Sequence, residues 1–312
     1  MKKRLNNNIT NIIYFSFIFL PISLISGPLI SDVLISLIVI LFISYCLINN
    51  EYKYFKNSFF FIFIIFYLWC LICALFSDYK LVSSLKSLVY FRFFIFALAV
   101  WFLFDHKKKI INYLLFSMLF CFLILLFDGY IQYFTGKNIL GYKMTGVRLS
   151  SFFKDELILG SYLSRFFPTI IALFFLSHYS KIKNLNIFFI LLIISTSSLI
   201  FLSGERAAFL FVIFTFFYLI IMANKYTKYL ILLLIILLLT ISVFSMQNKN
   251  ILNRMFEQTF IQAGISKGLS NFSFDHKGHY LIAWDLFTKN KFLGVGPKNF
   301  NNHCKNSLNY QK

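Results

Sequence analysis

Long apolar runs alternate with short polar segments along most of this 312-residue chain. A helix that crosses a bilayer needs about 20 mostly apolar residues. Nine runs of 16 or more residues approach or reach that length, at roughly 11–26, 29–48, 58–76, 87–104, 110–127, 157–177, 187–202, 207–222 and 228–245. The pattern therefore predicts an all-α, polytopic membrane protein with about nine transmembrane helices.

The polar segments between these runs predict the orientation. Lys and Arg concentrate in short loops on the cytoplasmic side. With a cytoplasmic N-terminus, the inner segments hold twelve Lys and Arg, whereas the short outer loops hold three, in 77–86 and 203–206. We therefore expect a transmembrane domain over residues 1–245 that contains an external loop at 128–156. We expect residues 246–312 to form an external, incomplete loop that carries an amphipathic segment.

The composition supports the membrane-protein class and limits the kinds of binding partner to expect. Hydrophobic residues make up 59% of the chain and charged residues only 13%, whereas soluble domains carry about 25% charged residues. The net charge of +19 fits loops that face anionic headgroups, so we expect membrane lipids and no nucleic acid as partners. Lys far outnumbers Arg, so each Arg is a candidate for a specific role. The six are Arg4, Arg92, Arg148, Arg165, Arg206 and Arg254.

Basic and aromatic residues are interleaved in the external loop and at the start of the sixth run. Arg148 and Lys154 stand among Tyr and Phe, which suits a segment that binds phosphates at the bilayer surface, although an ordinary membrane-surface loop would look similar. Arg165 lies about 13 Å along the helix from Glu156. At that depth we expect Arg165 to face protein or a water-filled cavity, either as a buried, satisfied charge or on a substrate path.

The short loop "LSGERAAF" joins the seventh and eighth runs. It places Arg206 beside free backbone N–H groups at a helix N-terminus, an arrangement that can hold a phosphate oxygen. Glu205 stands next to Arg206, and neutralisation of the arginine by this carboxylate is the competing interpretation.

The C-terminal segment "FDHKGHYLIAWDLFTKNKFLGVGPKNF" predicts a short amphipathic helix on the membrane surface, ended by "GVGP". Its polar side carries Lys277 and His279. The group His276, His279, His303 and Cys304 has only weakly zinc-like spacing, so we expect no metal. The chain holds no nucleotide-binding loop. We expect no cofactor.

Three segments, in this order, resemble the O-antigen ligase and O-antigen polymerase superfamily of bacterial envelope proteins. They are "GVRLSSFFKDELILGSYLSRFFP", "LSGERAAFL" and "HYLIAWDLFTKNKFLGVGPKNF", and the resemblance covers about residues 60 to 300. It implies a multi-pass glycosyltransferase in the bacterial inner membrane whose active face is periplasmic. Such proteins take a glycan from an undecaprenyl diphosphate carrier and join it to lipid A core or to another glycan.

The resemblance also implies roles for individual residues. Arg206 matches the family's arginine in the short loop, and we take Arg206 and His279 as the candidate catalytic residues. The candidate substrate-binding residues are Arg148, Arg165, Lys154 and Lys277. Many family members carry an arginine a few residues before the Trp of the amphipathic helix, and this chain has no such arginine near Trp284. The periplasmic His of the family lies beyond the segment that matches "GVGPKNF". We therefore expect a full-length member to contain two or three further spans.

Two other functions remain open from the sequence. A transporter or flippase for a lipid-linked or anionic solute would use Arg92 and Arg165 along its path. A non-catalytic subunit of an envelope-assembly complex would need neither residue for chemistry.

Overall fold

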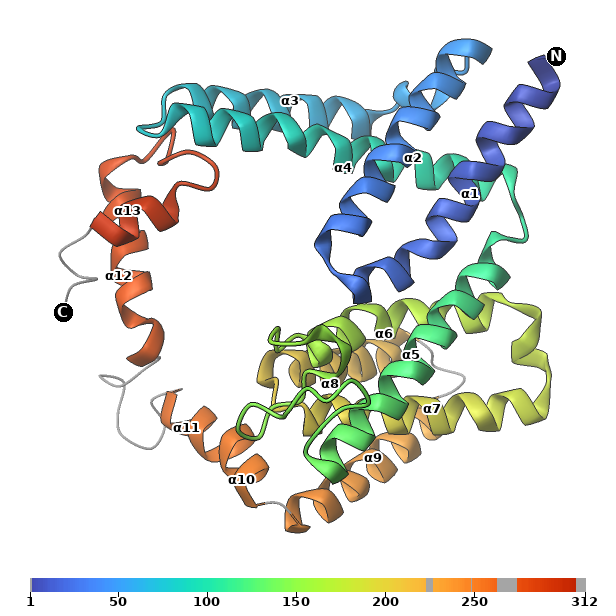
Figure 1. Ribbon diagram of the computed structural model, residues 1–312, viewed down its shortest axis with the longest axis vertical. Helices are drawn as coiled ribbons and strands as arrows, with labels where there is room; N and C mark the ends of the chain where they lie inside the picture. Colours follow the sequence, from blue (N-terminus) through green and yellow to red (C-terminus); the bar gives the residue numbers. More distant parts are fainter. Residues whose placement is uncertain (1, 223–226, 248, 263–273, 307–312) are drawn as a thin grey trace. The chain divides into compact units, whose positions relative to one another are not determined.

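A computed structural model describes residues 2–222, 227–247, 249–262 and 274–306 (Figure 1). The regular structure in these ranges is helical, apart from two isolated β-bridges in the loop after α5. The α-helices are α1 (Lys2–Ser26), α2 (Pro28–Asn49), α3 (Ser58–Leu75), α4 (Lys80–His106), α5 (Ile110–Thr135), α6 (Leu159–Leu176), α7 (Lys183–Leu202), α8 (Arg206–Met222), α9 (Thr227–Gln247), α10 (Lys249–Leu252), α11 (Gln258–Gln262), α12 (Phe274–Lys289) and α13 (Phe300–Asn306). Short 3-10 turns occupy Lys53–Phe55, Ser151–Phe153 and His178–Lys181, and a π-helical turn occupies Asn253–Glu257.

Eight of the described helices are long and apolar enough to cross a membrane, namely α1 to α7 and α9. The ninth predicted run is also helical, but α8 has only 17 residues. Helices suit a bilayer because they satisfy every backbone hydrogen bond within the segment. The prediction of an all-α, polytopic membrane protein is therefore confirmed.

Three helices extend well beyond their predicted runs. α1 begins at Lys2, not near residue 11. α4 begins at Lys80, not near residue 87, and α5 continues to Thr135, not to residue 127. α5 continues because its polar residues Asp128 and Gln132 are buried and hydrogen-bonded, and it ends at Gly136, which adopts a left-handed φ of 79°. The predicted loops 77–86 and 128–156 are correspondingly shorter.

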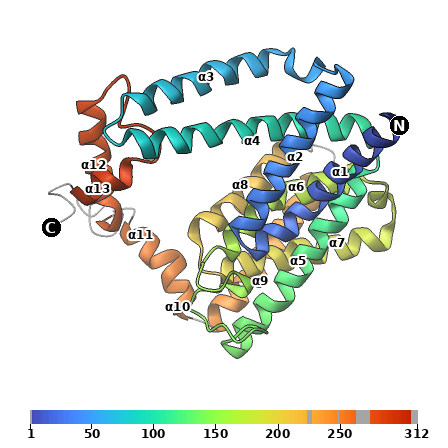
Figure 2. The same ribbon diagram turned by 45° about the horizontal axis from the view of Figure 1, so that its top comes forward.

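The chain divides into two compact units. Unit 1 comprises Met1–Phe17, Asp32–Lys108 and Ile261–Lys312. Its α3 and α4 form an antiparallel hairpin (Figure 2), in which the rings of Phe63 and Phe94 stack with centroids 3.8 Å apart. The Asn57 side chain caps α3 by accepting a 2.8 Å hydrogen bond from the Phe60 backbone N–H.

Unit 2 comprises Ile18–Ser31 and Lys109–Phe260. Helices α5 to α9 pack around fully buried aromatic side chains such as Phe122, Phe167 and Phe201. The Tyr162 hydroxyl of α6 donates a 2.7 Å hydrogen bond to the Pro21 carbonyl, so the end of α1 packs on this unit. Because consecutive helices alternate in direction, the ends of α5, α7 and α9 meet the starts of α6 and α8.

Candidate functional site

The turn between α7 and α8 forms the centre of the site. Ser203 ends α7 with a backbone hydrogen bond to Leu199, Gly204 adopts a left-handed φ of 71°, and α8 begins at Arg206. A Cβ added at Gly204 would lie 3.3 Å from the Arg254 side chain and 3.4 Å from that of Arg148. Glycine therefore supplies both the backbone conformation and the space for two arginines to approach the turn.

Glu205 fastens this turn to the start of α6. Its carboxylate is buried and accepts hydrogen bonds from Gly160 N at 2.7 Å, Ser161 N at 3.0 Å and Ser161 Oγ at 2.5 Å. A carboxylate at this end of a helix is stabilised by the free N–H groups and by the helix dipole. Both carboxylate oxygens thus accept hydrogen bonds from α6 and keep Glu205 at the turn, beside Arg206.

Arg254 is the third arginine near the turn. It lies in the π-helical turn after α10, and its Nε donates a 3.0 Å hydrogen bond to the Gly204 carbonyl. Burial lowers the pKa of Arg254 below its usual value, and the charges of Arg148 and Arg206 lower it further. The guanidinium groups of Arg148 and Arg206 therefore lie close enough to Arg254 to repel it.

Arg148 reaches the turn from the loop before α6. Its Nη2 donates a 2.9 Å hydrogen bond to the Leu157 carbonyl, while its buried Nε has no hydrogen-bond partner among the described residues. A neutral carbonyl satisfies a donor without cancelling the positive charge. Arg148 therefore adds to the positive charge of the site, which we call the arginine cluster: Arg148, Arg206 and Arg254.

Two buried side chains of α5 hold the loop that carries Arg148. Asp128 is fully buried and accepts hydrogen bonds from Ile139 N at 2.9 Å and Ser151 Oγ at 2.5 Å. Gln132 Oε1 accepts from Ser150 N at 3.0 Å and Ser151 N at 2.7 Å. These bonds hold two parts of the loop, at Ile139 and at Ser150–Ser151, against one face of α5. They therefore fix the position of the backbone next to Arg148.

The other predicted residues of unit 2 lie outside the cluster. Lys154 is exposed and adopts a left-handed φ of 57°. Arg165 is also exposed, on the side of α6 that carries Pro168, Thr169 and Ala172. Of the two surroundings expected for Arg165, the described residues do not enclose it in protein, because the buried residues of α6 occupy the other side of the helix. A water-filled cavity around Arg165 stays a prediction.

Lys277 and His279 belong to unit 1, and a shared site with the arginine cluster stays a prediction. Both residues are exposed on α12. The His279 Nδ1 lies 3.6 Å from the Cys304 sulfur. Within the described ranges, no three His, Cys, Asp or Glu side chains gather as metal ligands would, and the side chain of His276 lies outside those ranges.

Arg92 is satisfied within unit 1. Its Nη2 lies 2.9 Å from Asp32 Oδ2, and its Nη1 donates a 3.3 Å hydrogen bond to Ser36 Oγ. Arg92 therefore matches the pattern of an ion-paired charge between α2 and α4. This pairing weakens the case for Arg92 as an open position on a transport path.

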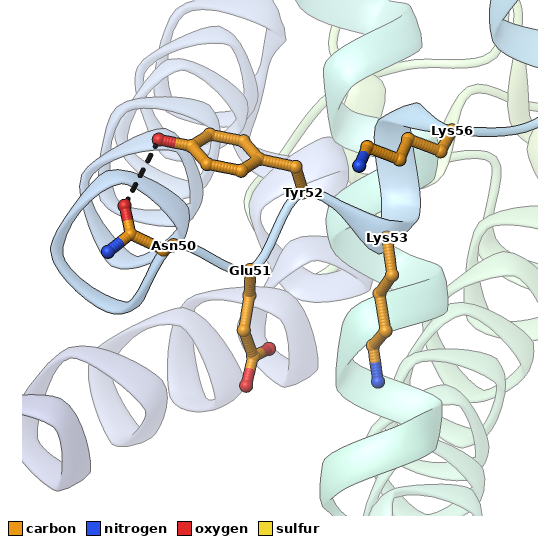
Figure 3. Close-up of a pocket in the computed structure, with 5 residues that line it drawn as sticks. All are labelled: Asn50, Glu51, Tyr52, Lys53 and Lys56. Atoms are coloured by element: carbon orange, nitrogen blue, oxygen red, sulfur yellow. Dashed lines mark hydrogen bonds between the residues drawn. The ribbon is translucent and has the colours of Figure 1, made fainter.

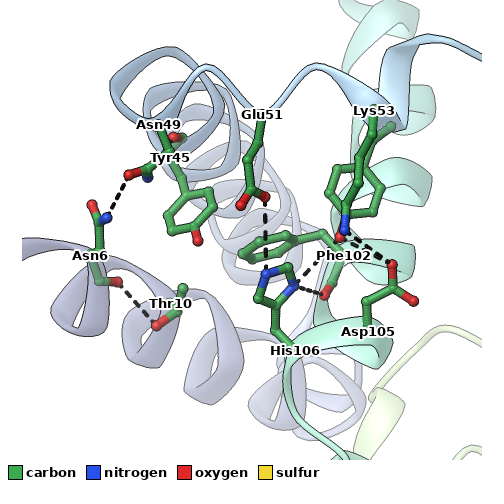
Figure 4. A network of polar contacts seen from close by, with 10 residues as sticks. Asn6, Thr10, Tyr45, Asn49, Glu51, Lys53, Phe102, Asp105 and His106 are labelled. Carbon is green, nitrogen blue, oxygen red and sulfur yellow. Dashed lines mark hydrogen bonds and ion pairs between the residues drawn. The ribbon is translucent and has the colours of Figure 1, made fainter. Parts of the chain in front are cut away.

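A pocket of 360 Å³ lies in the loop between α2 and α3 (Figure 3). It is lined by Asn50, Glu51, Tyr52, Lys53 and Lys56. Two of its charges have partners on α4: Glu51 lies 4.0 Å from the His106 ring and Lys53 lies 3.9 Å from Asp105 (Figure 4).

The same loop is anchored by Tyr54. This residue is fully buried and donates a 3.1 Å hydrogen bond to Asp105. Burial raises the pKa of Tyr54, and the bond to Asp105 raises it further. The polar network thus binds the loop to the end of α4, and we assign the pocket a structural role.

Sequence reasoning identified Arg148 and Arg206 but gave Arg254 no role. The rarity of Arg beside Lys was the signal that pointed to Arg254, yet its distance along the chain hid its partners. The arginine cluster, with its neighbouring carboxylate held by α6, can bind a multiply charged anion that has several acceptor oxygens.

Comparisons of the chain with protein-family models, with curated proteins and with solved structures find no match. The likeness to the O-antigen ligase and polymerase superfamily therefore rests on the three sequence segments alone. The membrane-protein class rests on the helices, and the anion site rests on the contacts around Gly204.

Proposed function

We propose that this protein is a membrane glycosyltransferase of the O-antigen ligase or polymerase type. Its donor is a glycan on an undecaprenyl diphosphate carrier, and its acceptor is lipid A core or a growing polysaccharide. The observation that carries the proposal is the convergence of Arg148, Arg206 and Arg254 on one turn.

The chemistry of this transfer explains why arginines suit the site. The bond from the sugar C1 to the diphosphate oxygen breaks, and the diphosphate leaves with the bonding electrons. The acceptor oxygen forms the new bond to C1 and loses its proton to a base. Guanidinium groups placed around the leaving group stabilise the developing negative charge, and their planar donors match phosphate oxygens.

Each residue has a role in this proposal. Arg206, at the N-terminus of α8, binds the diphosphate with help from the helix dipole. Arg148 and Arg254 bind the remaining oxygens. The arginine cluster holds no base for the acceptor proton, and His279 of unit 1 stays the sequence-based prediction for a catalytic residue. The site faces the periplasm, as the orientation from Lys and Arg predicts.

Binding of the carrier lipid tests the proposal directly. Undecaprenyl diphosphate is titrated into the purified protein in nanodiscs, with undecaprenol as the uncharged comparison. Arg206→Ala and Arg254→Ala each remove charged hydrogen bonds worth about 1.5–3 kcal/mol, so we expect affinity to fall roughly 10- to 100-fold. The matched control is Arg165→Ala, which removes an exposed arginine of α6 outside the cluster. This variant should leave the affinity unchanged. Equal affinity in all four proteins would overturn the proposal.

A second measurement separates transfer from transport, because both functions need an anion site. The protein in proteoliposomes is supplied with the glycan-loaded carrier and with lipid A core. Transfer predicts a glycosylated acceptor and free undecaprenyl diphosphate in equal amounts. Movement of the intact donor across the bilayer without a glycosylated acceptor would favour the transporter.

A further inference from the structure

One side of α12 exposes a row of aromatic residues. Tyr280, Trp284 and Phe287 are 58%, 66% and 53% exposed. Their spacing of four and three places them on one helix face. The rings of Trp284 and Phe287 lie 5.7 Å apart, so they form a continuous apolar surface.

The other side of α12 faces the protein. Ile282 is only 3% exposed, and His279 contacts α13 through Cys304 and the ring of Phe300. The buried Ile282 thus lies on the inward side of α12, and the aromatic face is uncovered. A stable water-facing helix would carry polar residues there.

The charges around this face are strongly one-sided. Between residues 277 and 305 the chain carries five Lys and a single acidic residue, Asp285. Asp285 pairs with Lys289 at 2.8 Å, whereas Lys277 and Lys291 are exposed beside the aromatic row. Exposed lysines around an aromatic face complement an anionic lipid surface.

The loop after α12 is anchored at the end of two membrane-spanning helices. The fully buried Asn299 donates through its side chain to Ser77 Oγ, in the turn between α3 and α4. Ser83 Oγ of α4 donates a 3.1 Å hydrogen bond to the Pro297 carbonyl.

Gly296 allows this close approach. It has a φ of 84°, and a Cβ at this position would collide with Ser77 and Ser83. The turn between two spanning helices lies where a bilayer ends. The anchor therefore holds α12 near the level of the headgroups.

The direction of α12 agrees with that placement. Figures 1 and 2 show α12 and α13 at the end of the hairpin where α3 ends and α4 begins, with α12 running across the direction of those two helices. A helix across two spanning helices lies along the membrane surface.

We propose that the aromatic face of α12 (Tyr280, Trp284 and Phe287) inserts into the headgroup region of an anionic phospholipid leaflet. Lys277 and Lys291 bind the lipid phosphates. Trp and Tyr suit this depth because their rings combine an apolar body with a polar group. The inference stands apart from the proposed function, since it uses none of the arginine cluster.

Depth-dependent quenching of Trp284 tests this inference. A chain with Trp69→Phe and Trp101→Phe keeps Trp284 alone and is placed in vesicles whose lipids carry bromine at shallow or deep positions. Because Trp101 packs on Tyr54, Trp101→Tyr is the second version if the first fails to fold. A chain that keeps only Trp69, on spanning helix α3, is the control and should be quenched by deep bromines.

We expect shallow bromines to quench Trp284 strongly and aqueous acrylamide to quench it weakly. Strong acrylamide quenching without bromine quenching would overturn the inference, because it places Trp284 in water. Quenching by neither agent would also overturn it, because protein would then cover this face.

Vesicle charge tests the role of the lysines. Phosphatidylglycerol should increase the shallow quenching relative to phosphatidylcholine alone, and Lys277→Gln with Lys291→Gln should remove that increase. The control pair Lys53→Gln with Lys56→Gln changes two exposed lysines of another loop. In this control, phosphatidylglycerol should still increase the shallow quenching. An effect of equal size in both pairs would overturn the assignment of these two lysines.

Discussion

At the scale of single residues, the partner of each arginine decides what its charge can do. Arg92 lies 2.9 Å from the carboxylate of Asp32, which compensates its charge. Arg148 and Arg254 donate instead to backbone carbonyls of Leu157 and Gly204, which leave the positive charge uncompensated. The same residue type thus serves in a structural ion pair in unit 1, whereas in unit 2 it forms the proposed anion-binding cluster.

Removing the carboxylate partner of Arg92 should destabilise unit 1. Asp32→Asn leaves a charge between α2 and α4 without its counter-ion, which we expect to cost about 1–2 kcal/mol because the Asp32 side chain is half exposed. Thermal unfolding in nanodiscs measures the loss. The double change Asp32→Asn with Arg92→Gln removes both charges and should recover part of the stability. If the double variant is less stable than the single one, the ion pair is not the cause.

At the scale of elements, helix ends build the candidate site. The start of α6 binds the Glu205 carboxylate, the end of α7 turns through Gly204, and the start of α8 carries Arg206. The polar residues Asp128 and Gln132 near the end of α5 bind the loop that carries Arg148. Free N–H groups, free carbonyls and left-handed turns occur at helix ends, and here they hold both the Glu205 carboxylate and the guanidinium groups of Arg148 and Arg254.

Gly204→Ala should impair both the turn and anion binding. Alanine in a left-handed conformation costs about 1–2 kcal/mol, and its Cβ would press on Arg254 and Arg148. Gly146→Ala is the matched control, since Gly146 has a similar φ of 63° and nothing within 4 Å of an added Cβ.

Both glycine variants should lose a similar amount of stability in thermal unfolding. Only Gly204→Ala should also weaken binding of undecaprenyl diphosphate. A similar loss of binding in both variants would show that backbone strain, not the position of the arginines, is responsible.

At the scale of the whole molecule, the order of the helices fixes which loops share a side of the membrane. When α8 is counted as a span, an odd number of crossings precedes each of three segments: the one before α6, the one between α7 and α8, and the one after α9. They therefore lie on one side, while the loop between α2 and α3 lies on the other. The cluster in unit 2 agrees with this arrangement, because Arg148, Arg206 and Arg254 come from those three segments.

Labelling of exposed positions tests the orientation. Lys154→Cys and Lys56→Cys place thiols at two exposed loop residues. With a cytoplasmic N-terminus, a membrane-impermeant maleimide added to intact spheroplasts should label Lys154→Cys and leave Lys56→Cys unlabelled until the membrane is opened. Four of the five native cysteines are buried, and the unsubstituted chain gives the background. The reverse labelling pattern would place the arginine cluster in the cytoplasm.

The apolar runs alone determined that this chain is an all-α, polytopic membrane protein. In lipid a backbone must satisfy its own hydrogen bonds, so long apolar runs form helices whatever their neighbours are. The sequence also indicated Arg148 and Arg206, because Arg is scarce beside Lys: Arg148 stands among aromatic residues in an expected external loop, and Arg206 at an expected helix end.

Only the tertiary structure decided how these residues meet. It added Arg254, which bonds to a carbonyl 50 positions away, and it engaged Glu205 with the start of α6, 44 and 45 positions away. It also placed Arg165 on an exposed side of α6 and extended α4 and α5 through polar residues. Hydropathy reports the preference of each segment for lipid. The partner of a charged side chain depends on which helix ends pack together, and that is settled only when the chain folds.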